Sequence, residues 1–70
     1  MPSSVIADIV YREERFELIV TFTTGKVYCY GLVPKTVYEN FRRARSKGSF
    51  FNSHVRDRYP ARRMPRSPAN

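Results

Sequence analysis

The chain has 70 residues, of which 41% are hydrophobic and 27% charged, a balance typical of one small globular domain. Thirteen Lys and Arg against six Asp and Glu give a net charge of +7, and one cysteine with one histidine exclude a disulfide scaffold and a Cys/His zinc module. No apolar run approaches the ~18–20 residues of a membrane span, and the N-terminus lacks the pattern of a secretory signal.

The first half of the sequence predicts three strands joined by short turns. Residues 5–11 are rich in β-branched and aromatic side chains, and residues 16–22 alternate apolar with other side chains. Residues 27–30 form a third short run after a turn at Thr24-Gly25. Connections this short join antiparallel neighbours, so we expect a three-stranded meander.

Two-residue turns at Glu13-Glu14 and Thr24-Gly25 predict the register of this sheet. In that register one face is wholly apolar and packs against a helix, whereas the opposite face is mixed. The predicted apolar face comprises Val5, Ala7, Ile9, Tyr11, Phe16, Leu18, Val20, Phe22, Val27 and Cys29. The predicted mixed face comprises Ile6, Asp8, Val10, Arg15, Glu17, Ile19, Thr21, Lys26, Tyr28 and Tyr30.

The second half opens with a helix. Val33-Pro34 is a helix-start signal, and Gly48 is a natural C-terminal stop. An apolar stripe at helical spacing lies between these two signals, and Glu39 precedes Arg43 by four residues, which predicts an ion pair. The stripe consists of Val37, Phe41, Ala44 and Gly48.

A second helical turn is predicted over residues 50–55, with Ser49 as its cap. Its Phe50, Phe51 and Val55 are expected to close one end of the core. Residues 56–64 have the composition of an extended surface segment, and residues 65–70 that of a disordered tail. Together these elements predict an α+β domain of two layers, with the helix covering the apolar face of the sheet.

Several short motifs together resemble the KTSC domain family, over residues 3–64. They are Tyr28-Cys29-Tyr30, Val33-Pro34, Val37-Tyr38, Ser46-Lys47-Gly48 with Phe51-Asn52, and Arg58-Tyr59-Pro60. The family takes its name from a C-terminal module of some lysyl-tRNA synthetases and includes short stand-alone proteins. The resemblance therefore implies a single domain, and the synthetase context suggests RNA binding in a family without an established function. Thr24 in the hairpin turn and Ala61 after Tyr-Pro depart from the family pattern.

Positive charge is concentrated in the second half. Residues 1–33 have a net charge of −1 and residues 34–70 of +8, and arginine outnumbers lysine by ten to three. Guanidinium groups bind phosphates in pairs of hydrogen bonds and stack on bases, so a local arginine excess favours a nucleic-acid partner over a merely solvated face. We expect these groups to gather along one side of the domain. The predicted phosphate-binding residues are Arg42, Arg43, Arg45, Lys47, Arg56, Arg58, Arg62 and Arg63.

Tyr28 and Tyr30 lie two apart on one predicted strand. On an open sheet face, such a pair forms a platform on which unpaired bases stack. The alternative is that the two rings cover a face packed by the C-terminal segment.

Catalytic chemistry is not expected. His54 has no second histidine or metal-ligand spacing around it, and Cys29 is expected to be a buried, unreactive thiol. The run Ser46-Lys47-Gly48-Ser49 lacks the flanking glycine of a phosphate loop and is interpreted as a helix stop.

The sequence therefore predicts a cytoplasmic, non-enzymatic module that binds nucleic acid, RNA over DNA, without a cofactor, metal, membrane or small-molecule substrate. The alternative is a protein-interaction or homodimerisation module that uses the mixed sheet face. The residues of that alternative interface are Ile6, Val10, Ile19, Tyr28 and Tyr30.

Overall fold

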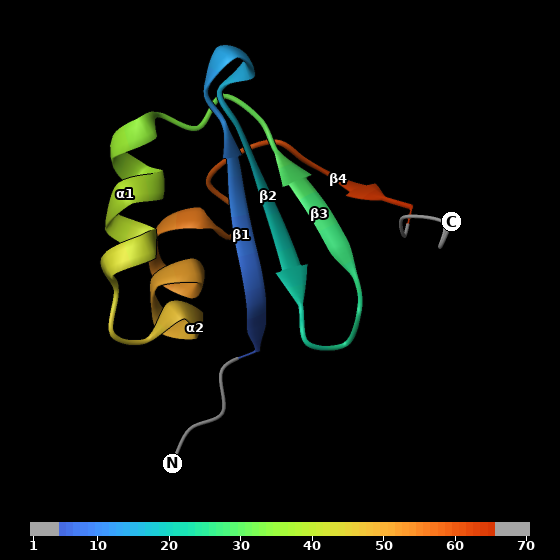
Figure 1. Cartoon of the computed structure of the whole chain (residues 1–70), viewed down its shortest axis with the longest axis vertical. Coiled ribbons are helices and arrows are strands. Elements are labelled where there is room, and N and C mark those ends of the chain that lie inside the picture. The colour runs from blue at the N-terminus through green and yellow to red at the C-terminus, as the bar shows by residue number, and fades with distance from the viewer. Residues whose placement is uncertain (1–4, 66–70) are drawn as a thin grey trace.

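A four-stranded antiparallel sheet forms one layer of the computed structural model, which describes residues 5–65 (Figure 1). The strands are β1 (Ile6–Arg12), β2 (Glu17–Phe22), β3 (Val27–Tyr30) and β4 (Ala61–Met64), and they lie side by side in that order. The α+β class is confirmed, with one strand more than predicted. The polar β4 has no strand pattern of its own; it forms because β3 has a free edge, where Cys29 pairs with Arg62.

The helices lie together on one side of the sheet (Figure 1). They are α1 (Lys35–Arg43), α2 (Lys47–Phe50) and a turn of π-helix, η2 (Phe51–Val55). The predicted start is confirmed, because Pro34 is the N-cap residue of α1. Within residues 5–65, none of the helices has the length and apolar character of a membrane-crossing segment.

The predicted end of α1 at Gly48 is wrong. The backbone is already extended at Ala44, and Ser46 caps a new helix by accepting a hydrogen bond from the Ser49 N–H at 3.2 Å. Ser46, rather than Ser49, is therefore the cap, and Gly48 lies inside α2. The hydroxyl of Ser46 satisfies a free N–H of α2, which favours a break at this position over a continuous helix.

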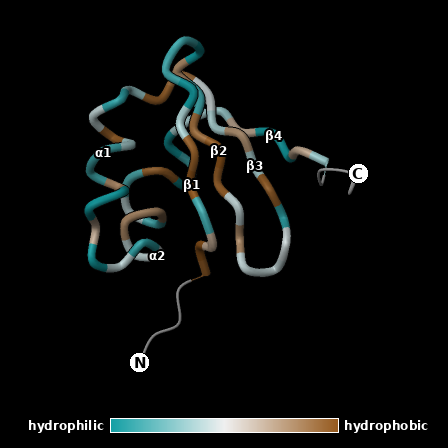
Figure 2. Tube along the Cα trace, in the orientation of Figure 1, coloured by the Kyte–Doolittle hydropathy of each residue, from teal (hydrophilic) through white to brown (hydrophobic). Residues whose placement is uncertain are grey.

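The core lies between the sheet and the helices. Its fully buried side chains come from β2, the loop before α1, α1 itself and η2. Figure 2 shows apolar stretches along β1, β2 and β3 and a largely hydrophilic α1. The predicted closure of the core by the second helical segment is confirmed, because Phe51 and Val55 are buried. The fully buried set is Leu18, Val20, Val33, Phe41 and Val55.

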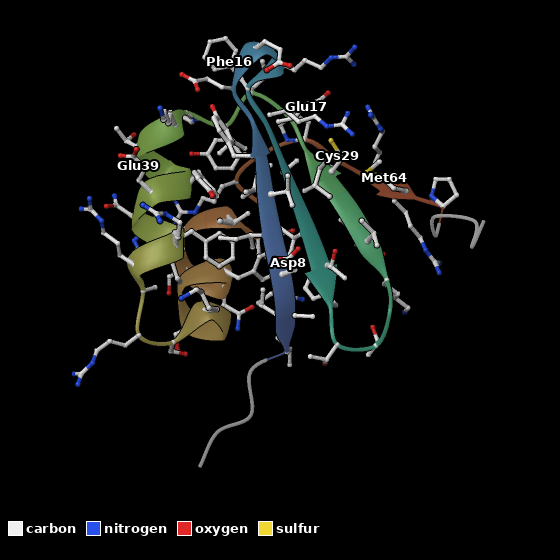
Figure 3. The ribbon with its side chains drawn as sticks, in the orientation of Figure 1. Asp8, Phe16, Glu17, Cys29, Glu39 and Met64 are labelled. Carbon is white, nitrogen blue, oxygen red and sulfur yellow. The ribbon has the colours of Figure 1, made fainter. Side chains whose placement is uncertain are left out.

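The first hairpin differs from the prediction by two residues. Tyr11 pairs with Leu18 rather than with Phe16, because residues Glu13–Arg15 form a 3-10 turn, η1, and Phe16 takes a left-handed φ of 55°. A shift of two keeps Leu18 on its predicted face. It moves Phe16, predicted to be buried, to the exposed tip of the hairpin (Figure 3).

The second hairpin differs by one residue, which exchanges the two faces of β3. Thr21 pairs with Val27 across a loop of residues 23–25, in which Gly25 has a φ of 96°. A glycine at positive φ closing a three-residue loop is a common hairpin connection. As a result Tyr28 and Tyr30 face the helices, and Cys29 faces away from them. The predicted burial of Cys29 is confirmed, but its predicted position on the helix-facing side of the sheet is wrong.

Candidate nucleic-acid interface

The tyrosine pair does not form the expected open platform. Tyr30 is buried, with 6% of its surface exposed, and its ring meets the edge of Phe51 at 5.7 Å between centroids. Tyr28 is half-buried and packs edge-on against Phe22 at 5.8 Å. Burial raises the pKa of the Tyr30 hydroxyl. The open platform is absent because the one-residue shift of register in the second hairpin turns both tyrosine rings toward the core. The two rings therefore cover a packed face, on which Tyr30 packs against Phe51 of η2 and Tyr28 against Phe22 of β2.

Most of the predicted phosphate-binding arginines have free guanidinium groups. Of the eight basic residues, all but Lys47 are exposed. Among residues 5–65, Arg56 is the one member of this set that makes an ion pair, to Asp57 at 3.9 Å. The expected pair between Glu39 and Arg43 does not form in the described chain. Lys47 Nζ donates to the Ala44 carbonyl at 2.8 Å. This bond gives a hydrogen-bond partner to the carbonyl of the residue that caps the C-terminus of α1.

The basic residues divide into two groups rather than gathering along one side. The helical group consists of Arg42, Arg43, Arg45 and Lys47, at the end of α1 and the start of α2. The C-terminal group consists of Arg56, Arg58, Arg62 and Arg63, in the connection after η2 and in β4. Figure 1 shows α1 and β4 on opposite sides of the molecule. Arg62 and Arg63 in β4 therefore lie away from the helical group, whereas Arg58 lies beside Asn40 of α1. The expectation of a single basic side is wrong, because the polar composition of residues 61–64 does not predict that they extend the sheet.

A basic residue from the first half joins the C-terminal group. Lys26, in the turn before β3, lines a surface hollow of about 420 Å³ together with Arg63, Met64 and Pro65. The pairing of Val27 with Met64 brings these segments together. Sequence reasoning missed Lys26 because the pairing partner, β4, was not predicted.

A larger groove, of about 490 Å³, lies between the helices and the segment that leads to β4. We call it the helical groove. Its lining combines apolar, aromatic and hydrogen-bonding side chains with one arginine. The lining residues are Val37 and Asn40 from α1, Phe50, Ser53 and His54 from α2 and η2, and Arg58 and Tyr59 from the connection.

Stacked rings fix one wall of the helical groove. Phe50 stacks on the buried Phe41 at 5.2 Å, and His54 stacks on Phe50 at 4.4 Å. A tight turn positions the arginine, since the Arg58 N–H donates to the Val55 carbonyl at 3.1 Å. Ring stacking onto a core side chain holds the imidazole of the exposed His54 in a defined orientation.

Polar side chains in the helical groove are free to bind a ligand. Asn40 and Ser53 are exposed, and neither forms a side-chain hydrogen bond within residues 5–65. Arg58 makes no ion pair in the same range. Sequence reasoning named Arg58 but missed Asn40, Ser53 and Tyr59. The motif Arg58-Tyr59-Pro60 was the available signal, because a tyrosine beside an arginine in an extended segment pairs a ring with a charge.

The face of the sheet turned away from the helices carries a different cluster. Cys29 is buried there beside Glu17, and both line a small hollow of about 170 Å³ with Arg62 (Figure 3). Burial, and next the Glu17 carboxylate, raise the pKa of the Cys29 thiol. Arg12 pairs with Glu17 at 3.9 Å. A raised pKa suppresses the thiolate, so this cysteine is a poor nucleophile.

Comparisons with known proteins place this chain among small domains of one type. The model of the KTSC domain family matches residues 2–59. A lysine–tRNA ligase from Nostoc punctiforme is 36% identical over 56 residues, which are 80% of this chain and 10% of the ligase. The chain thus spans about a tenth of the length of that curated relative. The crystal structure of a KTSC domain protein from Yersinia pestis superposes with a TM-score of 0.87 and 31% identity, over 93% of this chain and 92% of the other.

Proposed function

The chain belongs to the KTSC domain family, and from this premise we propose that it is a non-enzymatic module that binds nucleic acid, RNA in preference to DNA. The observation that supports this proposal most strongly is the exposure of unpaired arginines. Six of the eight predicted phosphate-binding residues are exposed arginines without an ion pair in residues 5–65. The likeness to a segment of a protein named lysine–tRNA ligase favours RNA.

The two-sided arrangement of the arginines favours a flexible partner. Phosphates of a single strand can reach the helical group and the C-terminal group in turn, because a single strand bends freely around a small domain. A duplex is stiff over this length, with a persistence length of roughly 150 base pairs, and meets one side at a time. The proposed ligand is therefore single-stranded RNA. Three acidic side chains, Glu13, Glu17 and Asp57, already face a basic partner.

Binding of a fluorescent single-stranded RNA, followed by anisotropy, tests the proposal. Each phosphate contact releases counterions, so affinity should fall steeply between about 50 and 200 mM salt. Replacing Arg42 and Arg43 with alanine, or Arg62 and Arg63, should weaken binding and flatten the salt dependence by about one contact for each lost arginine.

The matched control is the double variant Arg15→Ala with Lys35→Ala. It removes the same two charges from exposed positions next to Glu13 rather than from either basic group. The control should bind RNA as the wild-type chain does. Equal losses in all three double variants would mean that net charge alone attracts the RNA, and no binding at low salt would refute the proposal.

The open face of the sheet supports a second candidate function, homodimerisation. Val10 is 47% exposed, and it pairs across the sheet with Ile19, which pairs in turn with Cys29. The predicted interface is wrong for Ile6, Tyr28 and Tyr30, because Ile6 and Tyr30 are buried in the core and Tyr28 packs against it. Light scattering on the wild-type chain and on Ile19→Lys tests this candidate: a dimer that the substitution dissociates supports it, and a monomer at high protein concentration contradicts it.

A further inference from the structure

We propose that the helical groove binds one unpaired base of the nucleic acid together with its adjacent phosphate. This inference rests on the proposed function and names a site for it that involves neither of the tyrosines of β3. The groove lies beside the helical group, since α1 supplies both Asn40 to the groove and Arg43 to the group. A strand that contacts the arginines of α1 therefore passes the mouth of the groove.

The groove has a suitable size and wall for a base. Its volume of about 490 Å³ falls within the roughly 300–1,000 Å³ of small-molecule sites. The ring of His54 is covered by Phe50 on one face and is otherwise exposed, and Tyr59 lines the same groove. Bases splayed out of single-stranded RNA stack on aromatic and histidine side chains of this kind.

Hydrogen-bonding groups in the groove match the edge of a base. Asn40 has an amide that donates and accepts, and Ser53 has a hydroxyl that does both. Neither side chain has another hydrogen-bond partner within the described residues. A purine or pyrimidine edge is therefore able to replace the water at these groups with direct hydrogen bonds.

Arg58 supplies the phosphate contact. The carboxylate of the neighbouring Asp57 forms an ion pair with Arg56, with 3.9 Å between Oδ2 and Nε. The Arg58 guanidinium therefore has no ion pair within residues 5–65. Asp57 has a φ of 60°, and this left-handed residue reverses the chain so that Arg58 and Tyr59 follow along the groove. A ring and a free guanidinium side by side recognise a base and its phosphate as a unit.

The experiment compares two single strands of about ten nucleotides, one of adenosines and one of abasic units with the same phosphates. Backbone amide shifts of the ¹⁵N-labelled chain are followed during each titration. The adenosine strand should shift the amides of Asn40, Ser53, His54 and Tyr59 and bind about 5- to 150-fold more tightly, the range expected for one stacked base. The abasic strand should shift only residues around the other arginines.

The variants Asn40→Ala and Arg58→Ala should each reduce the preference for adenosine over the abasic strand. Arg45→Ala is the matched control, because Arg45 is also exposed and makes no ion pair in residues 5–65 but lies outside the groove. Arg45→Ala should lower the affinity for the adenosine strand and for the abasic strand by the same factor. Circular dichroism spectra and thermal melting of each variant show whether the fold is kept.

The outcomes separate this inference from the function on which it rests. Equal affinity for both strands, with shifts confined to Arg42, Arg43, Arg62 and Arg63, would overturn the base site while leaving nucleic-acid binding in place. Absence of any shift with either strand at low salt would refute both.

Discussion

The rings of Tyr11 and Tyr38 lie stacked, with their centroids 5.2 Å apart and their planes 13° from parallel. Tyr11 belongs to β1 and Tyr38 to α1, so this contact joins the two layers of the domain. The Tyr11 hydroxyl also donates to the Val33 carbonyl at 2.6 Å, which fixes the loop that leads into α1. One side chain thus positions both the start of α1 and its packing face, and with them the helical groove.

The first prediction concerns this hydrogen bond. Tyr11→Phe keeps the stacked ring but removes the hydroxyl that donates to the Val33 carbonyl, so the free energy of unfolding should fall by about 0.5–1.5 kcal/mol. Urea unfolding followed by circular dichroism measures the change. Tyr38→Phe is the control, since it keeps its ring in the stack and no hydrogen bond of its hydroxyl occurs within residues 5–65. An equal loss in both variants would contradict this assignment.

The second prediction concerns alkaline pH. Burial is the largest cause that raises the pKa of both Tyr11 and Tyr30 above the ordinary value of about 10. The folded state therefore holds these protons more tightly than the unfolded chain does. The contribution of these two tyrosines to stability should be constant below about pH 10 and fall as pH rises through their higher folded pKa values.

Urea unfolding at a series of pH values tests this prediction. The double variant Tyr11→Phe with Tyr30→Phe should lose less stability than the wild-type chain over the alkaline range, because the two hydroxyls that it removes can no longer ionise. Parallel loss in both proteins would show that other groups cause the alkaline unfolding.

The sequence predicted most of the sheet because local patterns specify it. Leu18 and Val20 lie two apart and are flanked by the polar Glu17 and Thr21, so the pattern assigns Leu18 and Val20 to the buried face of β2. The faces of β3 were not specified in this way, because Val27 and Cys29 are as apolar as the rings of Tyr28 and Tyr30. Packing decides between them: Tyr30 is buried with its ring edge-on to Phe51, a contact that the smaller side chain of Cys29 does not make.

The candidate site was less predictable than the fold. The arginines of the helix and tail are visible as a local excess of charge, but their division between two sides depends on β4, whose pairing with β3 is long-range. The helical groove depends on the break at Ala44, which ends α1 before the predicted stop at Gly48. A capping serine at Ser46 was the signal, and it competes with a stripe that continues smoothly from Phe41 to Gly48.

The third prediction concerns the reactivity of Cys29. The thiol is buried and its pKa is raised, so alkylation by iodoacetamide should be much slower in the folded chain than in the urea-unfolded chain. Glu17→Gln removes the second-largest cause of that raised pKa, and should therefore speed alkylation of the folded chain. Glu13→Gln, on the exposed hairpin, should leave the rate unchanged. An alkylation rate in Glu17→Gln equal to that of the wild-type chain would show that the Glu17 carboxylate does not lower the reactivity of Cys29.

The fourth prediction separates two interpretations of Gly48. As a helix stop it would need a left-handed backbone, and alanine would destabilise the protein. In the structure Gly48 lies within α2, and a Cβ there meets Val5 Cγ2 at an ordinary distance of 3.7 Å. Alanine loses less conformational entropy on folding than glycine, so Gly48→Ala should raise the free energy of unfolding by about 0.5–1 kcal/mol.

Gly25→Ala is the opposite case and serves as the comparison for Gly48→Ala. Gly25 has a φ of 96°, which an L side chain rarely adopts, so alanine at this position should destabilise the second hairpin by at least about 1 kcal/mol. Urea unfolding of the two variants side by side gives changes of opposite sign if the helices are divided at Ala44. Destabilisation by Gly48→Ala would instead support one helix ending at Gly48, and it would remove the break on which the helical groove depends.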